Sequence, residues 1–427
     1  MGVVQTVTNR VVEPTVLRLC QWRGDPVARM MLPKTRVDPY PLYTQVRQRG
    51  LVRSPLGVYA AADHATVASI LRDRRFSSSP AHQPRYRPPT YPHTDPRAQL
   101  PAADLLTLDP PDHTRLRRLV ASAFTPRAVA ALEPWIRDVT DRLLSVVDGA
   151  AGFDLINALA FPLPIAVICR LLGVPAEDQA RFRAWGHELA ATLEPQTAAA
   201  ARAQTRAAEL ALTTYLQDLV RKRRADPDDT ILSALIAAEE DGDRLTSGEV
   251  VSTALLLLVA GFETTVNLIG NGVVALLGDP DGYDRLRHDP DLAPPAVEEM
   301  LRYDSPVQMT SRIATEDVEV GGGVVPAGRA VLAFIGGANR DPAVFDHPDR
   351  FRMDRPDPGR HLSFSLGIHH CLGASLARLE GRIALEALVR KFPALEPAAA
   401  PTRRPLLVLR GFENVPVRVG RPATRVG

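Results

Sequence analysis

The stretch that decides the fold is Phe364-Ser-Leu-Gly-Ile-His-His-Cys-Leu-Gly-Ala-Ser-Leu-Ala-Arg-Leu-Glu380. We expect a turn that bends at Gly367 and becomes a helix at or just after Cys371. Apolar residues recur after it at steps of three and four, so one helix face runs to about Lys391. Cys371 then stands at a helix N-terminus, where free N–H groups and the positive end of the helix dipole favour a thiolate.

The residues around Cys371 indicate a metal ligand. A lone cysteine is more often a small buried apolar residue, but His369, Arg378 and two glycines crowd this turn. Zinc is disfavoured because His369, His370 and Cys371 are too close in sequence to surround one tetrahedral ion, and no second Cys/His pair lies nearby. A single thiolate suits a haem iron, whose four equatorial ligands come from the porphyrin.

A second anchor is a long apolar segment from about Ser247 to Leu277. Thr246 and Glu249 form a capping box ahead of it, and the glycine and proline after it end the predicted helix. Its middle, Ala260-Gly-Phe-Glu-Thr-Thr265, places polar groups in a buried helix, a local conflict that is typical of a functional site. We expect the Thr264 hydroxyl to bond back to the Ala260 carbonyl and loosen the helix there.

The loop pattern Phe-x-x-Gly-x-His-x-Cys-x-Gly resembles the haem-binding loop of the cytochrome P450 family, soluble bacterial type. The chain departs from the family at Ser365, where relatives normally have glycine, so we expect a tighter loop at that point. The resemblance implies that Cys371 binds the iron of haem b (iron protoporphyrin IX). It implies that Glu263 and Thr264 deliver protons to dioxygen bound in a groove of the long helix.

Further residues match the family's cofactor and substrate positions. The helix opened by Asp109-Pro-Pro-Asp carries His113 and Arg117 four residues apart on one face. Taken alone, such a pair is usually a solvated charged face. The resemblance implies cofactor-binding roles for His113, Arg117, Ala260, Arg312, Phe364, His369, Cys371 and Gly373. It implies that Val307, Met309 and Phe412 face the substrate pocket, with Phe412 in a turn formed by Gly411 to Asn414.

The segment Glu299-Met-Leu-Arg302 gives a helical pair at i, i+3 that is weak evidence by itself. Its position between the long helix and the cysteine loop matches the family's structural motif. The resemblance implies that Arg350, in Pro348-Asp-Arg-Phe351, is the third member of this scaffold. No chemical step is assigned to Glu299, Arg302 or Arg350.

Length and composition set limits on the class of protein. The chain of 427 residues is 45% hydrophobic with a formal charge of +2, enough for a large core and an enclosed cofactor but no support for nucleic-acid binding. Its three separated cysteines favour a reducing, cytoplasmic setting. No run reaches the roughly 18 apolar residues of a transmembrane segment. The N-terminal residues mix apolar and basic side chains, which leaves weak peripheral membrane contact open.

We therefore expect a fold that is mainly α with a smaller β region: a single helical body with a long central helix and minor β-sheets. The predicted division is an N-terminal arm at 1–37, a haem domain at 38–419 and a tail at 420–427. Residues 177–225 should form a pair of helices over the cavity.

The resemblance implies a monooxygenase that uses O2 on an apolar small molecule. No flavin or nicotinamide signature is present, so electrons would come from a ferredoxin and a ferredoxin reductase. A basic docking face is expected from Arg115, Arg118, Arg378 and Arg382. Two alternatives stay open: a peroxide-driven haem-thiolate peroxygenase, and a non-catalytic haem-binding sensor or carrier.

Overall fold

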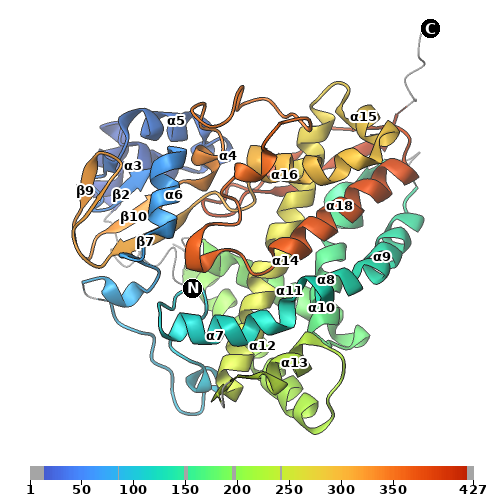
Figure 1. Cartoon of the computed structure of the whole chain (residues 1–427), viewed down its shortest axis with the longest axis horizontal. Coiled ribbons are helices and arrows are strands. Elements are labelled where there is room, and N and C mark those ends of the chain that lie inside the picture. Colours follow the sequence, from blue (N-terminus) through green and yellow to red (C-terminus); the bar gives the residue numbers. More distant parts are fainter. Residues whose placement is uncertain (1–13, 85, 149–151, 195–198, 241–242, 421–427) are drawn as a thin grey trace.

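The computed structural model describes residues 14–84, 86–148, 152–194, 199–240 and 243–420. It is mainly helical, at 57%, with several small sheets, as the sequence predicts. Figure 1 shows the helices on the right and below, and the strands gathered on the left beside α5 and α6. Predictions for residues 1–13 and 421–427 lie outside the described part of the chain.

Helix α14 (Ser247–Leu277) crosses the molecule and is its central element. Both ends are those predicted from the sequence: Thr246 and Glu249 form the capping box, and Gly278 is the C-cap residue. Its length and apolarity would suffice to cross a membrane, yet 61% of the apolar window is buried inside the fold, as in the core helix of a soluble protein. The burial explains why so apolar a helix is stable here.

The large helices pack around α14 and share one hydrophobic core with it. Four of them contact α14 directly: α10 (Pro162–Leu172), α11 (Gln179–Ala190), α12 (Ala199–Ala225) and α16 (Ala293–Tyr303). Helix α18 (Ala374–Lys391) also packs on α14, and α9 (Glu133–Ser145) covers α18. Helices α11 and α12 are the pair that was expected over the cavity.

The main sheet has five strands in the order β1-β2-β10-β7-β3. Strand β10 pairs parallel with β2 and antiparallel with β7, and the other pairs are antiparallel. The strands are β1 (Val52–Arg53), β2 (Tyr59–Ala61), β3 (Phe76–Ser77), β7 (Thr310–Ala314) and β10 (Ala330–Ala333). The sequence of residues 51–61, with Pro55 and Gly57 in its turn, predicts a β-hairpin, and the pairing of β1 with β2 confirms it. The sequence also predicts a strand at 305–312, and the observed β7 begins later, at Thr310.

Short elements complete the described chain. The helices are α5 (Tyr40–Arg49), α6 (His64–Arg72), α7 (Asp112–Ala121), α8 (Pro126–Ala131), α13 (Ile231–Ala237), α15 (Gly282–His288) and α17 (Ile335–Ala338). The strands are β4 (Phe153–Asp154), β5 (Glu239–Glu240), β6 (Asp243–Arg244), β8 (Val318–Val320), β9 (Gly323–Val325) and β11 (Leu395–Pro397). The sequence predicts a helix over 62–74 that Asp63 starts, and α6 begins at that cap, since Asp63 accepts a hydrogen bond from the Thr66 N–H at 2.8 Å.

The described part of the N-terminal arm is packed against the body. It forms α2 (Pro14–Trp22), α3 (Pro26–Met30) and α4 (Pro33–Val37). Val27, Ala28 and Met30 are buried in one cluster with residues of α5 and of the strand region. The boundary at residue 37 stays a prediction, but residues 14–37 contribute to a hydrophobic core.

The C-terminal region forms three strands: β12 (Thr402–Arg403), β13 (Phe412–Asn414) and β14 (Pro416–Val419). The prediction of a turn at 411–414 is wrong, because β13 occupies it and pairs with β12. Close packing explains the strand: a Cβ added to Gly411 would lie 1.8 Å from Asn267 Oδ1 of α14. Only a glycine lets the backbone approach the helix so closely.

Helix α18 begins at Ala374, three residues later than the earliest predicted start, and it ends at Lys391 as predicted. The turn before it has two left-handed residues, Gly367 with φ +68° and Ser365 with φ +60°. A side chain at Gly367 would collide with the Leu71 carbonyl oxygen, 2.7 Å away. Ser365 therefore adopts the conformation that favours the glycine found in relatives, and within the described residues its hydroxyl is buried without a partner.

A buried ion network fixes the segment that leads into this turn. Arg302 donates to both carboxylate oxygens of Glu299 at 2.6 and 2.7 Å, and both residues have no exposed surface. The prediction that Arg350 completes this set is wrong: its side chain is exposed, and only its backbone carbonyl takes part. The third member is Arg355, 6% exposed, which donates to Glu299 Oε2 at 3.0 Å.

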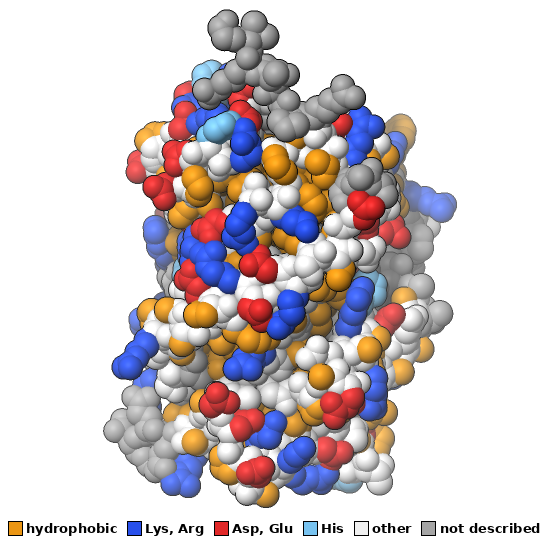
Figure 2. Space-filling view, turned by 90° about the vertical axis from the view of Figure 1, so that its right-hand side faces the viewer, with side chains coloured by type: hydrophobic (Ala, Val, Ile, Leu, Met, Phe, Trp, Pro, Cys, Tyr) orange, Lys and Arg blue, Asp and Glu red, His pale blue; other side chains and the backbone are white. Residues whose placement is uncertain are grey.

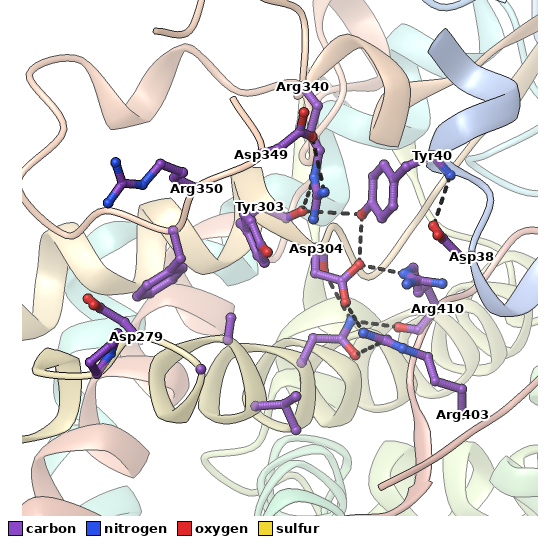
Figure 3. A pocket seen from close by; sticks show the side chains of 16 residues that line it. Asp38, Tyr40, Asp279, Tyr303, Asp304, Arg340, Asp349, Arg350, Arg403 and Arg410 are labelled. Carbon is purple, nitrogen blue, oxygen red and sulfur yellow. Dashed lines mark hydrogen bonds and ion pairs between the residues drawn. The ribbon is translucent and has the colours of Figure 1, made fainter. Parts of the chain in front are cut away.

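A polar cleft of about 500 Å³ lies at the C-terminal end of α14. Figure 3 shows Tyr40, Arg403 and Arg410 converging on Asp304 at its centre. Burial acts to raise the pKa of Asp304, but the charges of Arg410, Arg403 and Arg340 outweigh it and hold the pKa below its usual range. The cluster joins the start of α5, the end of α16 and the C-terminal segment, which are distant in sequence.

Arg355→Ala should lower the free energy of unfolding by about 3–5 kcal/mol, because it removes one partner of a buried carboxylate. Arg350→Ala is the matched control and should change it by less than about 0.5 kcal/mol, because that side chain is exposed. Urea denaturation of the two variants measures the difference. Equal effects would contradict the assignment of Arg355.

Ser365→Gly should raise the free energy of unfolding by about 1 kcal/mol, since glycine adopts the left-handed conformation without steric cost. Ser365→Ala removes the unpartnered hydroxyl but keeps the strained backbone, so it should gain less. Denaturant titration of both variants separates the two effects. A glycine variant that is no more stable than the alanine variant would show that φ is not the source of the strain.

Candidate active site

Cys371 follows the strained turn directly and precedes α18. Its N–H donates to the Phe364 carbonyl at 2.8 Å, which closes the turn. The Phe364 ring is buried and lies 4.5 Å beneath the guanidinium of Arg378, which is itself paired with Glu298 at 2.6 Å. Cys371 is exposed, whereas Cys20 and Cys169 are buried. The turn thus presents one accessible sulfur on a firmly held backbone.

The pKa of Cys371 is raised rather than lowered, which differs from the expectation that the helix N-terminus would favour the thiolate. Although the residue is accessible to solvent, the protein atoms packed around its thiol desolvate it and raise its pKa, and the Gly373 N–H and the charges of Arg117 and Arg378 offset this only in part. The helix begins three residues later than Cys371, so the dipole acts from farther away. A bound cation would therefore have to stabilise the thiolate. A Cβ on Gly373 would contact nothing within 4 Å, so this side of the turn is open.

Two buried histidines meet beside this turn. The rings of His113 and His369 lie 4.4 Å apart, and in the described structure the Nε2 atom of each is buried without a hydrogen-bond partner. Burial and the nearby charges of Arg312 and Arg117 lower the pKa of His369 to about 3. Burial and Arg117 also lower the pKa of His113. Both imidazoles are therefore neutral at pH 7.

Two arginines complete this cluster. Arg312 is 6% exposed, and within the described residues its guanidinium donates to Thr310 Oγ1 at 3.0 Å and to the Ser311 carbonyl at 2.9 Å. Burial lowers its pKa to about 10, which Asp109 partly opposes. Arg117 donates to the His370 carbonyl at 2.6 Å, which ties the cluster to the cysteine turn. No carboxylate of the described residues lies within ion-pair distance of either guanidinium.

Four of the predicted cofactor-binding residues, His113, Arg117, Arg312 and His369, are thus brought together from α7, β7 and the turn before α18. Two arginines and two unpartnered imidazoles in a buried place suit a ligand with carboxylate groups. Among the described residues, no group of three His, Cys, Asp or Glu side chains could hold a metal ion by itself. A metal at Cys371 would need its remaining ligands from another molecule.

The middle of α14 is the second half of the site. The Thr264 hydroxyl donates to the Ala260 carbonyl at 2.8 Å, as predicted from the sequence. Gly261 is exposed, and Ala260 and Thr264 are half-buried, on a helix whose neighbouring residues are buried. Figure 1 shows the turn before α18 between β7 and the middle of α14, and α18 packs on α14. This face of α14 is apolar apart from Thr264.

Glu263 is fully buried and has a partner that sequence reasoning missed. One of its carboxylate oxygens pairs with Arg404, which also donates to Asn267 Oδ1 at 2.9 Å. The other oxygen, Oε2, has no partner among the described residues. The available signal was indirect: a carboxylate in a buried helix requires a cation, but nothing near Thr402-Arg-Arg-Pro405 indicates that position 263 is its target.

Three predicted pocket residues lie elsewhere. Met309 is 2% exposed in the cluster that contains the N-terminal helices, and strand alternation places it opposite to Arg312. Phe412 is 3% exposed in the main core and stacks 3.9 Å from the Arg403 guanidinium. Val307 is half-buried and forms a bridge with Leu409. The pocket prediction is therefore wrong for Met309 and Phe412, which are core residues.

Comparison with known proteins gives the family. The family model described as Cytochrome P450 matches residues 81–409. The chain is 42% identical over 407 residues to Cytochrome P450 107B1 of Saccharopolyspora erythraea, covering 94% of each protein. It is 42% identical over 395 residues to Vitamin D(3) 25-hydroxylase of Pseudonocardia autotrophica, covering 90% of this chain and 94% of that one.

The solved structures agree with the sequence comparison. The crystal structure of P450BioI in complex with hexadec-9Z-enoic acid ligated acyl carrier protein matches 91% of this chain and 99% of that one, with a TM-score of 0.84 and 36% identity. The fold, the exposed cysteine before α18 and the relatives lead to one conclusion. The chain belongs to the cytochrome P450 family and is a monooxygenase with haem b as its cofactor.

Proposed function

We propose that this monooxygenase uses O2 and electrons from a ferredoxin and its reductase to oxidise an apolar small molecule in the cytoplasm. The observation that carries the proposal is the partly buried cluster of His113, Arg117, Arg312 and His369 beside an exposed Cys371. This donor set fits haem b, which carries carboxylate groups on one edge and an iron that takes a single thiolate.

The roles in holding haem follow from this fit. Cys371 Sγ would bind the iron, and Arg117 and Arg312 would pair with the propionates, to which the free Nε2 atoms of His113 and His369 could also bond. Gly373 has no side chain that would obstruct the flat ring. The bound haem supplies the iron that activates O2. The polypeptide supplies the ligand, the orientation and the exclusion of water.

We assign proton delivery to Glu263 and Thr264. Thr264 lies on the accessible face of α14, and its hydroxyl can turn from the Ala260 carbonyl towards a ligand. Glu263 is the adjacent buried acid and can resupply the proton that Thr264 gives up. Both groups lie in the turn that the sequence singles out as locally unfavourable.

The apolar substrate is supported by the lining and by the relatives. Leu255, Leu256, Leu257 and Val259 are half-buried on α14 just before the polar turn. We propose that those of these side chains that share the face of Thr264 line the pocket, where they would select apolar molecules through the hydrophobic effect. One relative is named a vitamin D(3) hydroxylase, and one solved relative holds a fatty acid attached to its carrier protein. We infer a substrate of similar apolarity.

The expected basic docking face needs revision. Arg115 pairs with Asp243 and Glu249, Arg378 with Glu298, and Arg382 with Glu133 and Glu386. Figure 2 shows the face that lies on the right in Figure 1, where both signs of charge are interspersed. These arginines do not form one unneutralised basic surface.

We place the ferredoxin contact instead at the end of α6. A Cβ on Gly367 would lie 3.3 Å from the Arg72 Cα, so this end abuts the turn before Cys371. Arg72 and Arg74 are exposed and, within the described residues, no carboxylate lies within ion-pair distance of either. Unneutralised cations near the cysteine favour an acidic electron donor.

Carbon monoxide added to the reduced holoenzyme should give the Soret band characteristic of the family, and Cys371→Ser should abolish it. Spectral titration with fatty acids, terpenoids, steroids and polyketides should then identify a binder that raises NADH oxidation in the presence of ferredoxin and reductase.

Thr264→Ala should lower product formed per NADH by about tenfold, because proton delivery is lost.

Thr265→Ala is the matched control for Thr264→Ala. The Thr265 hydroxyl makes the same kind of bond, to the Gly261 carbonyl at 3.1 Å, but its side chain is buried. This variant should keep the product yield. A holoenzyme that binds carbon monoxide but never oxidises NADH would favour a sensor or carrier, and turnover with peroxide alone would favour a peroxygenase.

Arg72→Glu combined with Arg74→Glu should raise the KM for ferredoxin by roughly tenfold at low salt, with less effect as ionic strength rises. Lys222→Glu with Arg224→Glu is the control, since these exposed cations lie at the C-terminal end of α12, away from α6 in Figure 1. KM is measured by varying ferredoxin with reductase in excess. Equal effects of the two double variants would rule out the site at α6.

A further inference from the structure

A segment near the C-terminus contacts three parts of the fold: the chain that leads into β7, the residue that follows α11, and the middle of α14. We call residues 403–410 the C-terminal strap. Its backbone pairs with the chain that leads into β7: the Gln308 N–H donates to the Val408 carbonyl at 2.8 Å, and the Arg410 N–H donates to the Pro306 carbonyl at 2.9 Å. The strap therefore has a fixed course along the strand region.

Its middle is gripped by an acid that follows α11. The Glu194 carboxylate accepts hydrogen bonds from three successive N–H groups, those of Leu407 at 2.7 Å, Val408 at 2.9 Å and Leu409 at 2.8 Å. Burial raises the pKa of Glu194, while these bonds and the charge of Arg36 oppose the rise. Three N–H donors converging on one carboxylate form a specific, directional contact.

The start of the strap enters the site. Arg404 pairs with Glu263 and donates to Asn267, both on α14, and its N–H donates to the Gly411 carbonyl at 3.1 Å. Its two basic neighbours are fixed elsewhere, because Arg403 and Arg410 both bind Asp304. Figure 3 shows these two side chains meeting at that carboxylate. Arg404 is thus the one arginine of the strap that points at a proposed catalytic acid.

We propose that Arg404 is a positioning residue that orients the Glu263 carboxylate for proton delivery. We also propose that Glu194 fixes the position of Arg404 through its hydrogen bonds to the backbone of the strap. The proposal rests on the role assigned to Glu263 above. It links the end of α11, through Glu194 and the strap, to the acid that we propose supplies protons.

The physical reason is the charge of Glu263. A carboxylate with no exposed surface is costly unless a cation compensates it, and Arg404 is its partner in the described structure. If the strap shifts, Arg404 moves with it, and the Glu263 side chain loses the contact that orients it. Glu194 binds the strap only three to five residues from Arg404. A displacement of the backbone at the Glu194 contact would therefore also displace Arg404.

The first test needs no turnover. Glu194→Gln in the holoenzyme keeps the shape but removes the charge, so the amides of residues 407–409 should exchange with deuterium about tenfold faster. Glu396→Gln is the control, because Glu396 is a carboxylate half exposed to solvent that pairs with Arg418 at 2.7 Å. An unchanged rate of amide exchange at residues 407–409 in Glu194→Gln would overturn the proposal that Glu194 holds the strap.

The second test follows protons. Arg404→Gln should lower product per NADH by about tenfold and enlarge the solvent deuterium isotope effect on turnover, and Arg404→Lys should restore most of both. Vitamin D(3), or the panel molecule that shifts the spectrum most, serves as substrate. Arg418→Gln is the control.

Glu194→Gln should act in the same direction more weakly, and it should add nothing in an Arg404→Gln background, because it works through Arg404.

The outcomes separate the two proposals. If Glu263→Gln leaves product per NADH unchanged, the role of Glu263 is wrong and the inference fails with it. If Glu263→Gln lowers it and Arg404→Gln does not, the function stands and only the inference fails. Additive losses in the double variant would show that Glu194 acts independently of Arg404.

Discussion

Compensation of buried charge is the constraint on which the rest of this structure depends. Glu299 is held by two arginines, Asp304 by two arginines and a tyrosine, and Glu263 by Arg404. Each set joins segments that are far apart in sequence, because a charge in a dry interior is tolerated only with a partner. These contacts fix where the helical body meets the strand region, and so they fix the site between them.

The exception to this compensation marks the cofactor. Arg312 and Arg117 have no acid at ion-pair distance among the described residues, and the imidazoles of His113 and His369 leave buried nitrogens unsatisfied. The carboxylates of Glu263, Glu299 and Asp304 are all paired with arginines, whereas these four donors lie together with no acid at ion-pair distance among the described residues, an arrangement that suits an anionic ligand. In the proposed function the carboxylates of haem would be the partner of these donors, and the thiol of Cys371, whose pKa desolvation raises, would gain from a nearby cation in the same way.

Local determinants made much of this predictable. The two ends of α14, the cap at Asp63 and the bond from Thr264 to Ala260 depend on residues within four positions, and all were predicted. The errors are non-local. Arg350 and Arg355 lie in the same basic run, and only the folded path shows which one reaches Glu299. Phe412 became a core residue because β13 packs tightly on α14 through Gly411.

The same distinction explains why the substrate is harder to read from the sequence than the chemistry. The cysteine turn and the polar turn of α14 each depart from a local structural rule. The cysteine turn contains a serine with a left-handed backbone, and the turn of α14 contains a charged residue in a buried helix. The wall of the pocket breaks no rule, since half-buried leucines are ordinary in any helix. The course of the strap is equally hard to read from the sequence, because it depends on long-range contacts such as those of Glu194 with the N–H groups of residues 407–409, which no local pattern indicates.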